Sequence, residues 1–332
     1  MPRWLFSCID GHTAGNPVRL VHGGAPVLSG DTMSARRADF LARFDWIRRS
    51  LMFEPRGHDM MSGGFIYPAL SPDADAAILF IETSGCLPMC GHGTIGIVTF
   101  GLEHGLITPR TPGRLTLDVP AGRITVDYVQ AGDRVTSVRI HNVTSYLAET
   151  DLLVETELGP LKFDIAYGGN FYAIVEPQPG YPGLDALGAE AIVRISRAMR
   201  ARIRDQVTPV HPLDPTIRGV SHILWADQPR SAGADGRNAV FYGDKAIDRS
   251  PCGTGTSARL AQLAGRGRLK AGDRFVHESY IGSRFTGRVE EVTTLAGRPA
   301  IRPSIEGQAF ATGFNTIWVD QDDPFWAGFE VL

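Results

Sequence analysis

The pattern of apolar and polar positions along the chain predicts two similar halves built from short strands and helices. Apolar runs at residues 4–10 and 18–21 flank a stretch rich in turn-forming residues at 11–17, a pattern typical of a β-hairpin. The same pattern returns at residues 161–175, where Gly168-Gly169-Asn170 separates two strand-like runs. This repeat indicates a duplicated domain.

An amphipathic helix is predicted after each hairpin. Ser34 can cap a helix that runs to about Ser50, because apolar residues recur there at three- and four-residue spacing. The same spacing of apolar residues predicts a second amphipathic helix from about Leu187 to Arg204. Between the first helix and the next strand, residues 54–64 form a polar, glycine-containing loop of a kind that often lines a site.

Both halves continue with strands and a short cysteine segment. The segments are Pro88-Met89-Cys90-Gly91-His92-Gly93-Thr94 and Ser250-Pro251-Cys252-Gly253-Thr254-Gly255-Thr256, and each lies between a strand-like run and a helix-like run. The interval from asparagine to cysteine is 74 residues in the first half and 82 in the second. We therefore expect domains at 1–148 and 149–307, with the segment 308–332 packed back on the first. Further strands are expected at 76–83, 115–119, 124–128, 135–140, 221–225, 238–242, 274–278 and 287–292.

Composition narrows the classes of protein that need to be considered. With 332 residues, 43% hydrophobic and 21% charged, the chain can bury a core in each of two domains. A net charge of −3 without clustered basic residues argues against nucleic acid as a partner. The chain turns polar at Asp10 and contains no apolar run of about 18 residues, so we expect neither a signal peptide nor a membrane span, and we expect a cytoplasmic protein.

The four cysteines are predicted to have two different roles. They form neither a disulfide framework nor the C-x2-C spacing of a zinc site. Cys8, inside a strand, and Cys86 are expected to be inert core residues, the usual state of a buried thiol. Cys90 and Cys252 should each begin a helix, where unpaired N–H groups and the helix dipole favour anions and lower the pKa of a thiol.

Two thiols of this kind suggest a reaction that needs both an acid and a base. A base can remove a proton from one face of a carbon while an acid returns a proton to the other face, which inverts the stereocentre. The same helix N–H groups can hold a carboxylate and stabilise the charge that develops on it. The residues alone therefore favour a racemase or epimerase with its site where the two halves face one another.

The two cysteine motifs resemble those of the proline racemase family, and within it the 4-hydroxyproline 2-epimerase branch. The similarity covers essentially the whole chain, including Asp10-Gly11-His12-Thr13 and Glu54-Pro55-Arg56-Gly57-His58. It implies an α+β fold like that of diaminopimelate epimerase, with two similar domains, each a mainly antiparallel sheet or barrel around a central helix, and an active site in the interdomain cleft. It also implies that no cofactor is used and that the partner is a small molecule, hydroxyproline or proline. A homodimer is compatible with the sequence.

The resemblance assigns roles to individual residues. Cys90 and Cys252 would be the two acid/base residues, and the N–H groups of Gly91, His92, Gly253 and Thr254 would hold the substrate carboxylate. Asp248 would accept a hydrogen bond from the ring ammonium, although an aspartate there is otherwise more often a helix cap or a surface charge. His222 and His92 would contact the ring hydroxyl, and for His222 a role as a buried core histidine has equal weight.

Alternatives remain in the same family and outside it. Proline racemase keeps both cysteines, whereas the 3-hydroxyproline dehydratases of the family resemble this sequence but have threonine at the position of Cys252. Polar side chains such as His92 and His222 favour a hydroxylated ring, because an unpartnered buried polar group costs about 1–3 kcal/mol. A thiol redox enzyme would form a disulfide between Cys90 and either Cys86 or Cys252 in turnover, but the C-x3-C spacing of Cys86 and Cys90 is weak evidence for it. An amino-acid-binding protein would have no use for two activated thiols.

Overall fold

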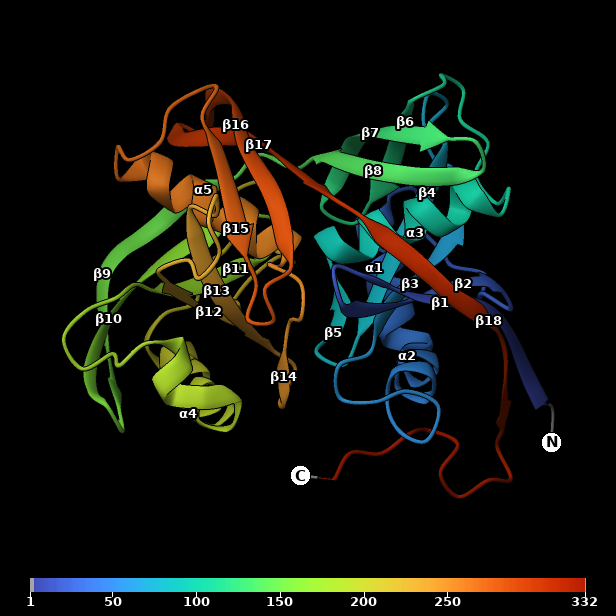
Figure 1. Cartoon of the computed structure of the whole chain (residues 1–332). Coiled ribbons are helices and arrows are strands. Elements are labelled where there is room, and N and C mark those ends of the chain that lie inside the picture. Colours follow the sequence, from blue (N-terminus) through green and yellow to red (C-terminus); the bar gives the residue numbers. More distant parts are fainter. Residues whose placement is uncertain (1–2, 332) are drawn as a thin grey trace. The chain divides into compact units, whose positions relative to one another are not determined.

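A computed structural model describes residues 3–331 of the chain. The chain divides into two compact units. The first comprises the chain up to Ile140 together with the segment from Gly307 onward, and the second is His141–Glu306. Each unit combines strands with a small number of helices, so the predicted α+β class is confirmed (Figure 1).

In the first unit, most neighbouring strands are antiparallel and two pairs are parallel. Strand β18 pairs with β1, β1 with β2, β3 with β4, β4 with β5 and β6 with β7, all antiparallel, while β2–β3 and β4–β6 are parallel. The elements are β1 (Arg3–Thr13), β2 (Asn16–Gly23), α1 (Met33–Arg43), α2 (Asp45–Met52), β3 (Ser62–Tyr67), β4 (Ala76–Glu82), β5 (Gly85–Leu87), α3 (Gly91–Glu103), β6 (Arg114–Val119), β7 (Gly122–Ala131), β8 (Arg134–His141) and β18 (Ala309–Asp320).

The second unit repeats this pairing order. Strand β9 pairs with β10, β10 with β11, β12 with β13, β13 with β14, β15 with β16 and β16 with β17, all antiparallel, while β11–β12 and β13–β15 are parallel. The elements are β9 (Tyr146–Thr156), β10 (Gly159–Tyr167), β11 (Phe171–Val175), α4 (Leu184–Gln206), β12 (Val220–Asp227), β13 (Gly236–Tyr242), β14 (Ala246–Ile247), α5 (Gly253–Gly265), β15 (Arg274–Glu278), β16 (Arg284–Leu295) and β17 (Arg298–Gly307).

One helix in each unit is buried on all sides. Every residue from Gly91 to Gly101 in α3 is buried, and so is every residue from Gly253 to Leu263 in α5. A helix buried all round belongs in the interior of its domain, and Figure 1 shows the strands of each unit curving around its helix. Because the cysteines precede these helices, both helix N-termini are held by packing along the whole length of the helix.

The structure corrects several predicted boundaries. The first amphipathic helix is capped by Thr32, whose Oγ1 accepts from the N–H of Ala35 at 3.1 Å, rather than by Ser34. It breaks at Phe44 into α1 and α2. Strand β3 begins at Ser62, inside the predicted loop, because Gly63 and Gly64 pair with β4. Helix α4 begins before Leu187 and contains non-helical backbone at Gly188.

The predicted hairpin in the first half is tighter than expected. Thr13 and Asn16 are paired across the turn, and Ala14 and Gly15 both have positive φ, at 49° and 92°. Positive φ at both central residues is the type I′ turn that suits the right-handed twist of two antiparallel strands. This turn brings the side chains of Thr13 and Asn16 to the first turn of α3, where both contact His92.

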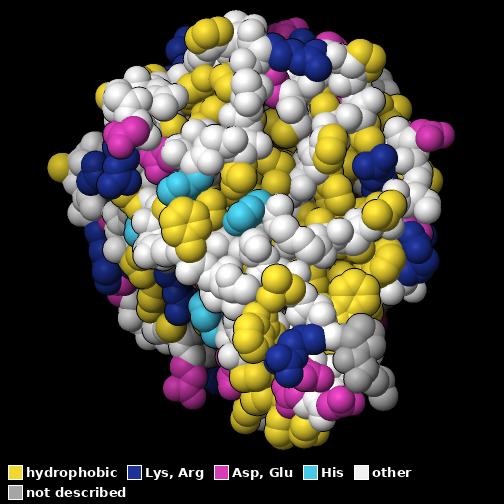
Figure 2. Space-filling model, turned by 90° about the vertical axis from the view of Figure 1, so that its right-hand side faces the viewer, with side chains coloured by type: hydrophobic (Ala, Val, Ile, Leu, Met, Phe, Trp, Pro, Cys, Tyr) yellow, Lys and Arg dark blue, Asp and Glu magenta, His cyan; other side chains and the backbone are white. Residues whose placement is uncertain are grey.

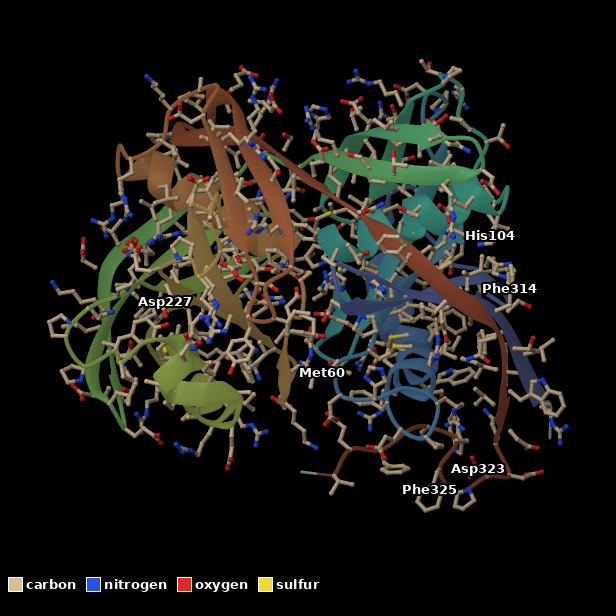
Figure 3. The ribbon with its side chains drawn as sticks, viewed as in Figure 1. Met60, His104, Asp227, Phe314, Asp323 and Phe325 are labelled. Carbon is tan, nitrogen blue, oxygen red and sulfur yellow. The ribbon has the colours of Figure 1, made fainter. Side chains whose placement is uncertain are left out.

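Several apolar side chains of the first unit reach the surface. Phe314 of β18 is 73% exposed and its ring meets that of His104, at the end of α3, edge-on with centroids 5.0 Å apart (Figure 3). Hydrophobic side chains are interspersed with polar and charged ones on the face in Figure 2.

Among residues 3–331, no helix is long and apolar enough to cross a membrane.

Candidate active site

Cys90 is the N-cap of α3 and is almost completely buried. Its backbone is extended, with φ −138° and ψ 108°, and its carbonyl accepts hydrogen bonds from the N–H and the Oγ1 of Thr94 at 2.9 and 2.7 Å. The sulfur lies 3.6 Å from Nδ1 and 3.9 Å from Nε2 of His92, and 4.0 Å from Oγ of Ser62. The first thiol is therefore packed against an imidazole ring.

Two polar side chains contact the ring of His92, and a third contacts its backbone carbonyl. Nε2 lies 2.9 Å from the amide nitrogen of Asn16 and 2.9 Å from the hydroxyl of Ser62, while the carbonyl of His92 accepts from Thr13 Oγ1 at 2.8 Å. All four side chains are buried. A fully buried polar group is stable only when it is hydrogen-bonded, so these contacts determine the orientation of the ring.

Cys252 is the N-cap of α5 but has a different conformation and different partners. Its φ of 63° lies in the left-handed region, which is strained for a residue with a side chain. The sulfur accepts from the N–H of Gly255 at 3.4 Å and lies 3.3 Å from the hydroxyl of Tyr172 and 3.9 Å from that of Thr254. The second thiol is thus surrounded by hydroxyl groups and a backbone N–H group.

The strained backbone at Cys252 is stabilised by side chains on both sides. The carbonyl of Pro251 accepts from Asn238 Nδ2 at 2.7 Å and from Thr256 Oγ1 at 3.2 Å. On the other side, the N–H of Cys252 donates to Ser250 Oγ at 3.1 Å, and that hydroxyl donates to Asp248 Oδ1 at 2.7 Å. These contacts offset the strain, which is of order 1–3 kcal/mol.

The expected lowering of a thiol pKa by the helix terminus is wrong for Cys252. Burial raises its pKa above the ordinary range, and the negative charge of Asp248 acts in the same direction. The hydrogen bonds from Tyr172, Gly255 and Thr254 lower the pKa but do not outweigh burial. Cys252 is therefore a protonated thiol at neutral pH, suited to act as an acid.

The other predicted side chains of the second unit lie around Cys252. His222 in β12 is buried and its ring stacks on that of Tyr172, with centroids 4.7 Å apart. The ring of Tyr242, in β13, continues the stack, with its centroid 6.4 Å from that of His222. Asp248 is 2% exposed, and its Oδ1 accepts from the N–H of Ser250, so it is neither a surface charge nor the helix cap.

The predicted carboxylate-binding N–H groups belong to the first turns of the two buried helices. Gly91 and His92 open α3, and Gly253 and Thr254 open α5. The first N–H groups of a helix have no acceptor within the helix, and the dipole makes this end positive. Each unit can thus present a pair of N–H groups beside its sulfur.

Sequence reasoning assigned no role to Asn16, Asn170 or Tyr172, and it placed Ser62 only in a loop that could line a site. Asn16 and Asn170 follow the equivalent turns of the two halves, and each donates to the residue two positions after the cysteine: Asn16 to His92, and Asn170 to Thr254 at 3.4 Å. The repeated Gly-Asn pair was a usable signal for them. Tyr172 carried no signal beyond that of a strand aromatic.

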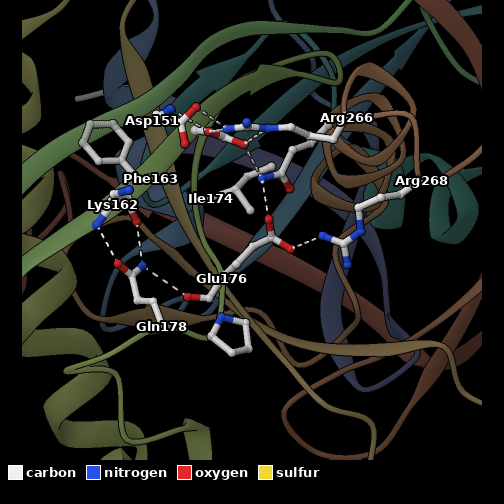
Figure 4. Close-up of a pocket in the computed structure, with 11 residues that line it drawn as sticks. Asp151, Lys162, Phe163, Ile174, Glu176, Gln178, Arg266 and Arg268 are labelled. Carbon is white, nitrogen blue, oxygen red and sulfur yellow. Dashed lines mark hydrogen bonds and ion pairs between the residues drawn. The ribbon is translucent and has the colours of Figure 1, made fainter.

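A separate cavity in the second unit has a charged lining but none of the predicted site residues (Figure 4). It has a volume of about 420 Å³. Asp164 pairs with Arg266 at 2.6 Å, and Glu176 pairs with Arg268 at 2.7 Å. Opposite charges in its wall thus largely neutralise one another. Nowhere within residues 3–331, this cavity included, is a group of three or more His, Cys, Asp and Glu side chains placed to hold a metal ion.

Comparison with known proteins identifies relatives over the full length of the chain. The family model for proline racemase matches residues 8–330. The chain is 60% identical over 333 residues to a 4-hydroxyproline 2-epimerase of Shewanella loihica, and 60% identical over 332 residues to a 4-hydroxyproline 2-epimerase of Brucella suis, with complete coverage of both chains in each case.

A solved structure with the same fold is a hydroxyproline epimerase from Agrobacterium vitis with bound trans-4-hydroxy-L-proline. It is 33% identical in sequence, with a TM-score of 0.92, and the match covers 99% of this chain and 95% of that one. The resemblance inferred from the two cysteine motifs is confirmed.

Proposed function

Because the chain belongs to the proline racemase family, we propose that it is a 4-hydroxyproline 2-epimerase. It would interconvert trans-4-hydroxy-L-proline and cis-4-hydroxy-D-proline without a cofactor. The observation that carries this proposal is 60% identity over the whole chain to proteins with that name, combined with a cysteine at the N-cap of each buried helix.

The proposed mechanism uses one thiol as base and the other as acid. Cys252 supplies the acid, since its raised pKa keeps it protonated. Cys90 then supplies the thiolate that removes the proton from the α carbon, and Cys252 gives its proton to the opposite face. The inverted product leaves Cys90 protonated and Cys252 as thiolate, and proton exchange with solvent or the reverse reaction restores the starting state.

The carbanion formed next to the carboxylate needs stabilisation by hydrogen-bond donors. The N–H groups of Gly91 and His92, and those of Gly253 and Thr254, would bind the carboxylate oxygens as charge grows on them. One well-placed donor of this kind is worth about 3 kcal/mol in the transition state. The buried charge of Asp248 supports its predicted role as acceptor for the ring ammonium.

Polar side chains beside the sulfurs support a hydroxylated ring over proline itself. In the second unit, the ring of His222 stacks on that of Tyr172. In the first unit, the ring of His92 contacts both Cys90 and Ser62. Such side chains can form a hydrogen bond with a ring hydroxyl, whereas the methylene that proline carries at that position can form none. A cytoplasmic location and a homodimer remain predictions from the sequence.

Proton exchange and inversion, measured together, test this function. The protein is incubated in D2O with trans-4-hydroxy-L-proline, without added cofactor, while NMR follows the α proton and polarimetry follows inversion. Loss of the α proton with formation of cis-4-hydroxy-D-proline is expected, and slower exchange with L-proline. Faster exchange with L-proline would instead identify a proline racemase. No exchange with either compound, together with elimination of water from trans-3-hydroxy-L-proline, would identify a dehydratase.

A further inference from the structure

The two N-cap cysteines differ in the orientation of the peptide that precedes them. Their ψ angles are nearly equal, 108° for Cys90 and 110° for Cys252, whereas their φ angles are −138° and 63°. The φ angles thus differ by about half a turn. Because a peptide unit is planar, a half-turn of the unit between Pro251 and Cys252 changes φ in this way while the Cα atoms stay in place. The second unit therefore holds this peptide in a reversed orientation.

The carbonyl side of the reversed peptide is bound by two buried donors. The carbonyl of Pro251 accepts from Asn238 Nδ2 at 2.7 Å and from Thr256 Oγ1 at 3.2 Å. A carbonyl can only accept, so the amide of Asn238 must present its nitrogen here. The ring of His277 lies behind both donors, with Nδ1 2.9 Å from Thr256 Oγ1 and 3.3 Å from Asn238 Nδ2. The imidazole thus holds the two donor side chains in place.

The N–H side of the same peptide is linked to the carboxylate of Asp248. The N–H of Cys252 donates to Ser250 Oγ at 3.1 Å, and that hydroxyl donates to Asp248 Oδ1 at 2.7 Å, beside a second bond from the N–H of Ser250 at 2.8 Å. With the peptide turned back, a carbonyl oxygen would take the place of the N–H group. The hydroxyl of Ser250 could then donate to that oxygen and would no longer orient the carboxylate.

Two apolar residues of the first unit stand where the second unit has Asn238 and His277. Strands β4 and β13 have seven residues each, and their first residues pair with Leu117 and His277 respectively. The third residue is Ile78 in β4 and Asn238 in β13. All four side chains are buried. A buried polar pair is stable only when it is hydrogen-bonded, and here the reversed peptide before Cys252 provides an acceptor.

We propose that Asn238 and His277 are positioning residues that hold the peptide before Cys252 in its reversed orientation. Through this peptide they orient the carboxylate of Asp248 toward the ring ammonium of the substrate. This inference rests on the proposed function, in which Asp248 accepts from that ammonium. The N–H groups proposed to bind the substrate carboxylate are not affected, because the carbonyl of Cys252 accepts from the N–H of Thr256 at 2.7 Å and holds the start of α5.

The orientation of the peptide is tested first, by crystal structures of the natural protein and of Asn238→Ala. Cys252 should have a positive φ in the natural protein and a negative φ in the variant, in which the carbonyl of Pro251 has turned away. A positive φ retained in Asn238→Ala would overturn the proposal, and so would a negative φ in the natural protein. This measurement requires no turnover of substrate.

The effect on the substrate is tested by calorimetry with two ligands. One is trans-4-hydroxy-L-proline, and the other is cyclopentanecarboxylate, which has a ring carboxylate but no nitrogen. Asn238→Ala should raise the Kd of hydroxyproline about tenfold, because a hydrogen bond between charged groups is weakened. The Kd of cyclopentanecarboxylate should not change. An equal weakening of both ligands would show general damage to the site and would overturn the proposal.

Ile78→Ala is the matched control, because it removes a buried side chain at the equivalent position of the first unit. It should lower the melting temperature and leave the φ of Cys252 and both Kd values unchanged. The same selective loss of hydroxyproline binding in this variant would overturn the proposal.

Variants of His277 keep the test independent of the folding of Asn238→Ala. His277→Leu introduces the residue type found at the equivalent position of the first unit and should show the same selective loss of hydroxyproline binding. His277→Asn should bind hydroxyproline like the natural protein, because its amide can occupy the place of Nδ1. Equal binding of hydroxyproline by the two variants would overturn the role of His277.

These readouts are separate from the proposed function. If the structures and the selective loss were as expected but no α proton of hydroxyproline were exchanged, the epimerase function alone would fail. If exchange and inversion occurred while Asn238→Ala weakened both ligands equally, the function would stand and this inference alone would fail.

Discussion

The hydroxyl oxygen of Tyr172 lies 3.3 Å from the sulfur of Cys252 and 2.5 Å from the hydroxyl of Thr254. All three side chains are buried. After Cys252 has given its proton to the substrate, the sulfur carries a negative charge in a site where burial disfavours charge. The hydroxyl of Tyr172 is placed to donate to that thiolate.

We therefore expect Tyr172→Phe to lower kcat about tenfold or more, since a hydrogen bond to a charged group contributes about 1.5–3 kcal/mol. The ratio of kcat/KM between the two directions should not change, because the equilibrium between the isomers is independent of the enzyme. Polarimetry from either isomer measures both directions. An unchanged kcat in a folded variant would argue against a role for this hydroxyl at the thiolate.

Replacing either helix-cap cysteine should separate proton exchange from inversion. With Cys252→Ala, the thiol at Cys90 can still remove a proton but has no partner on the other face, so we expect loss of epimerisation with residual deuterium exchange in one isomer only. Cys90→Ala should show residual exchange in the other isomer. NMR in D2O with chiral analysis of the products measures both.

Cys8→Ala provides the matched control for these variants. Cys8 is equally buried, but it lies in β1 and burial raises the pKa of its thiol to about 12, so it stays protonated. It should retain epimerase activity while losing some stability. Inversion by either Cys90→Ala or Cys252→Ala at the rate of Cys8→Ala would contradict the two-thiol mechanism.

Gly93→Ala should impair activity more than stability. A Cβ at Gly93 would lie 2.8 Å from the sulfur of Cys90, closer than real contacts allow, so the sulfur must shift. Alanine is at the same time the better helix former by about 1 kcal/mol. We expect a fall in kcat of about tenfold from a displaced base with little change in melting temperature, measured by the D2O assay and by calorimetry. Gly313→Ala is the control, since a Cβ there meets open space.

The free energy of unfolding should fall as the pH rises above about 9. Burial raises the pKa of the Cys86 thiol from 9.0 to about 12. Between these values the unfolded chain loses this proton and the folded chain keeps it, so the thiol lowers stability by up to about 1.4 kcal/mol per pH unit. In urea unfolding at pH 8, 9 and 10, the free energy of unfolding should fall more steeply with pH in the natural protein than in Cys86→Ala. Equal slopes would contradict the raised pKa.

In acid, the opposite dependence is expected from His277. Burial, with a smaller contribution from the charge of Arg259, lowers the pKa of His277 from 6.5 to about 3. Between these values the unfolded chain binds a proton that the folded chain does not, so stability is complete above about pH 6.5 and is lost toward pH 3. Between pH 7 and pH 4, the free energy of unfolding measured in urea should fall less steeply in His277→Gln than in the natural protein. A steeper fall in the variant would exclude this histidine as a cause of acid sensitivity.

The local pattern of the chain was enough to predict most of the fold. Alternating and amphipathic runs predicted the hairpins and the main helices, and the Gly-Asn turns and cysteine segments predicted the duplication. Some errors came where two nearby residues could both cap a helix, as with Thr32, which caps α1, and Ser34, which does not. Others came where pairing with another strand sets the start of a strand, as at Ser62. Strand β9 was missed because much of its length is exposed and polar.

The sequence by itself determined that Cys90 and Cys252 begin two helices, because glycines, a preceding strand and a following apolar run are all local signals. Only the tertiary structure decided how the two thiols differ. The imidazole of His92 is oriented by Asn16, 76 residues away, and the sulfur of Cys252 lies beside Tyr172, 80 residues away. Burial and hydrogen bonding set the charge state of a thiol, and both depend on residues brought together by the packing of distant strands.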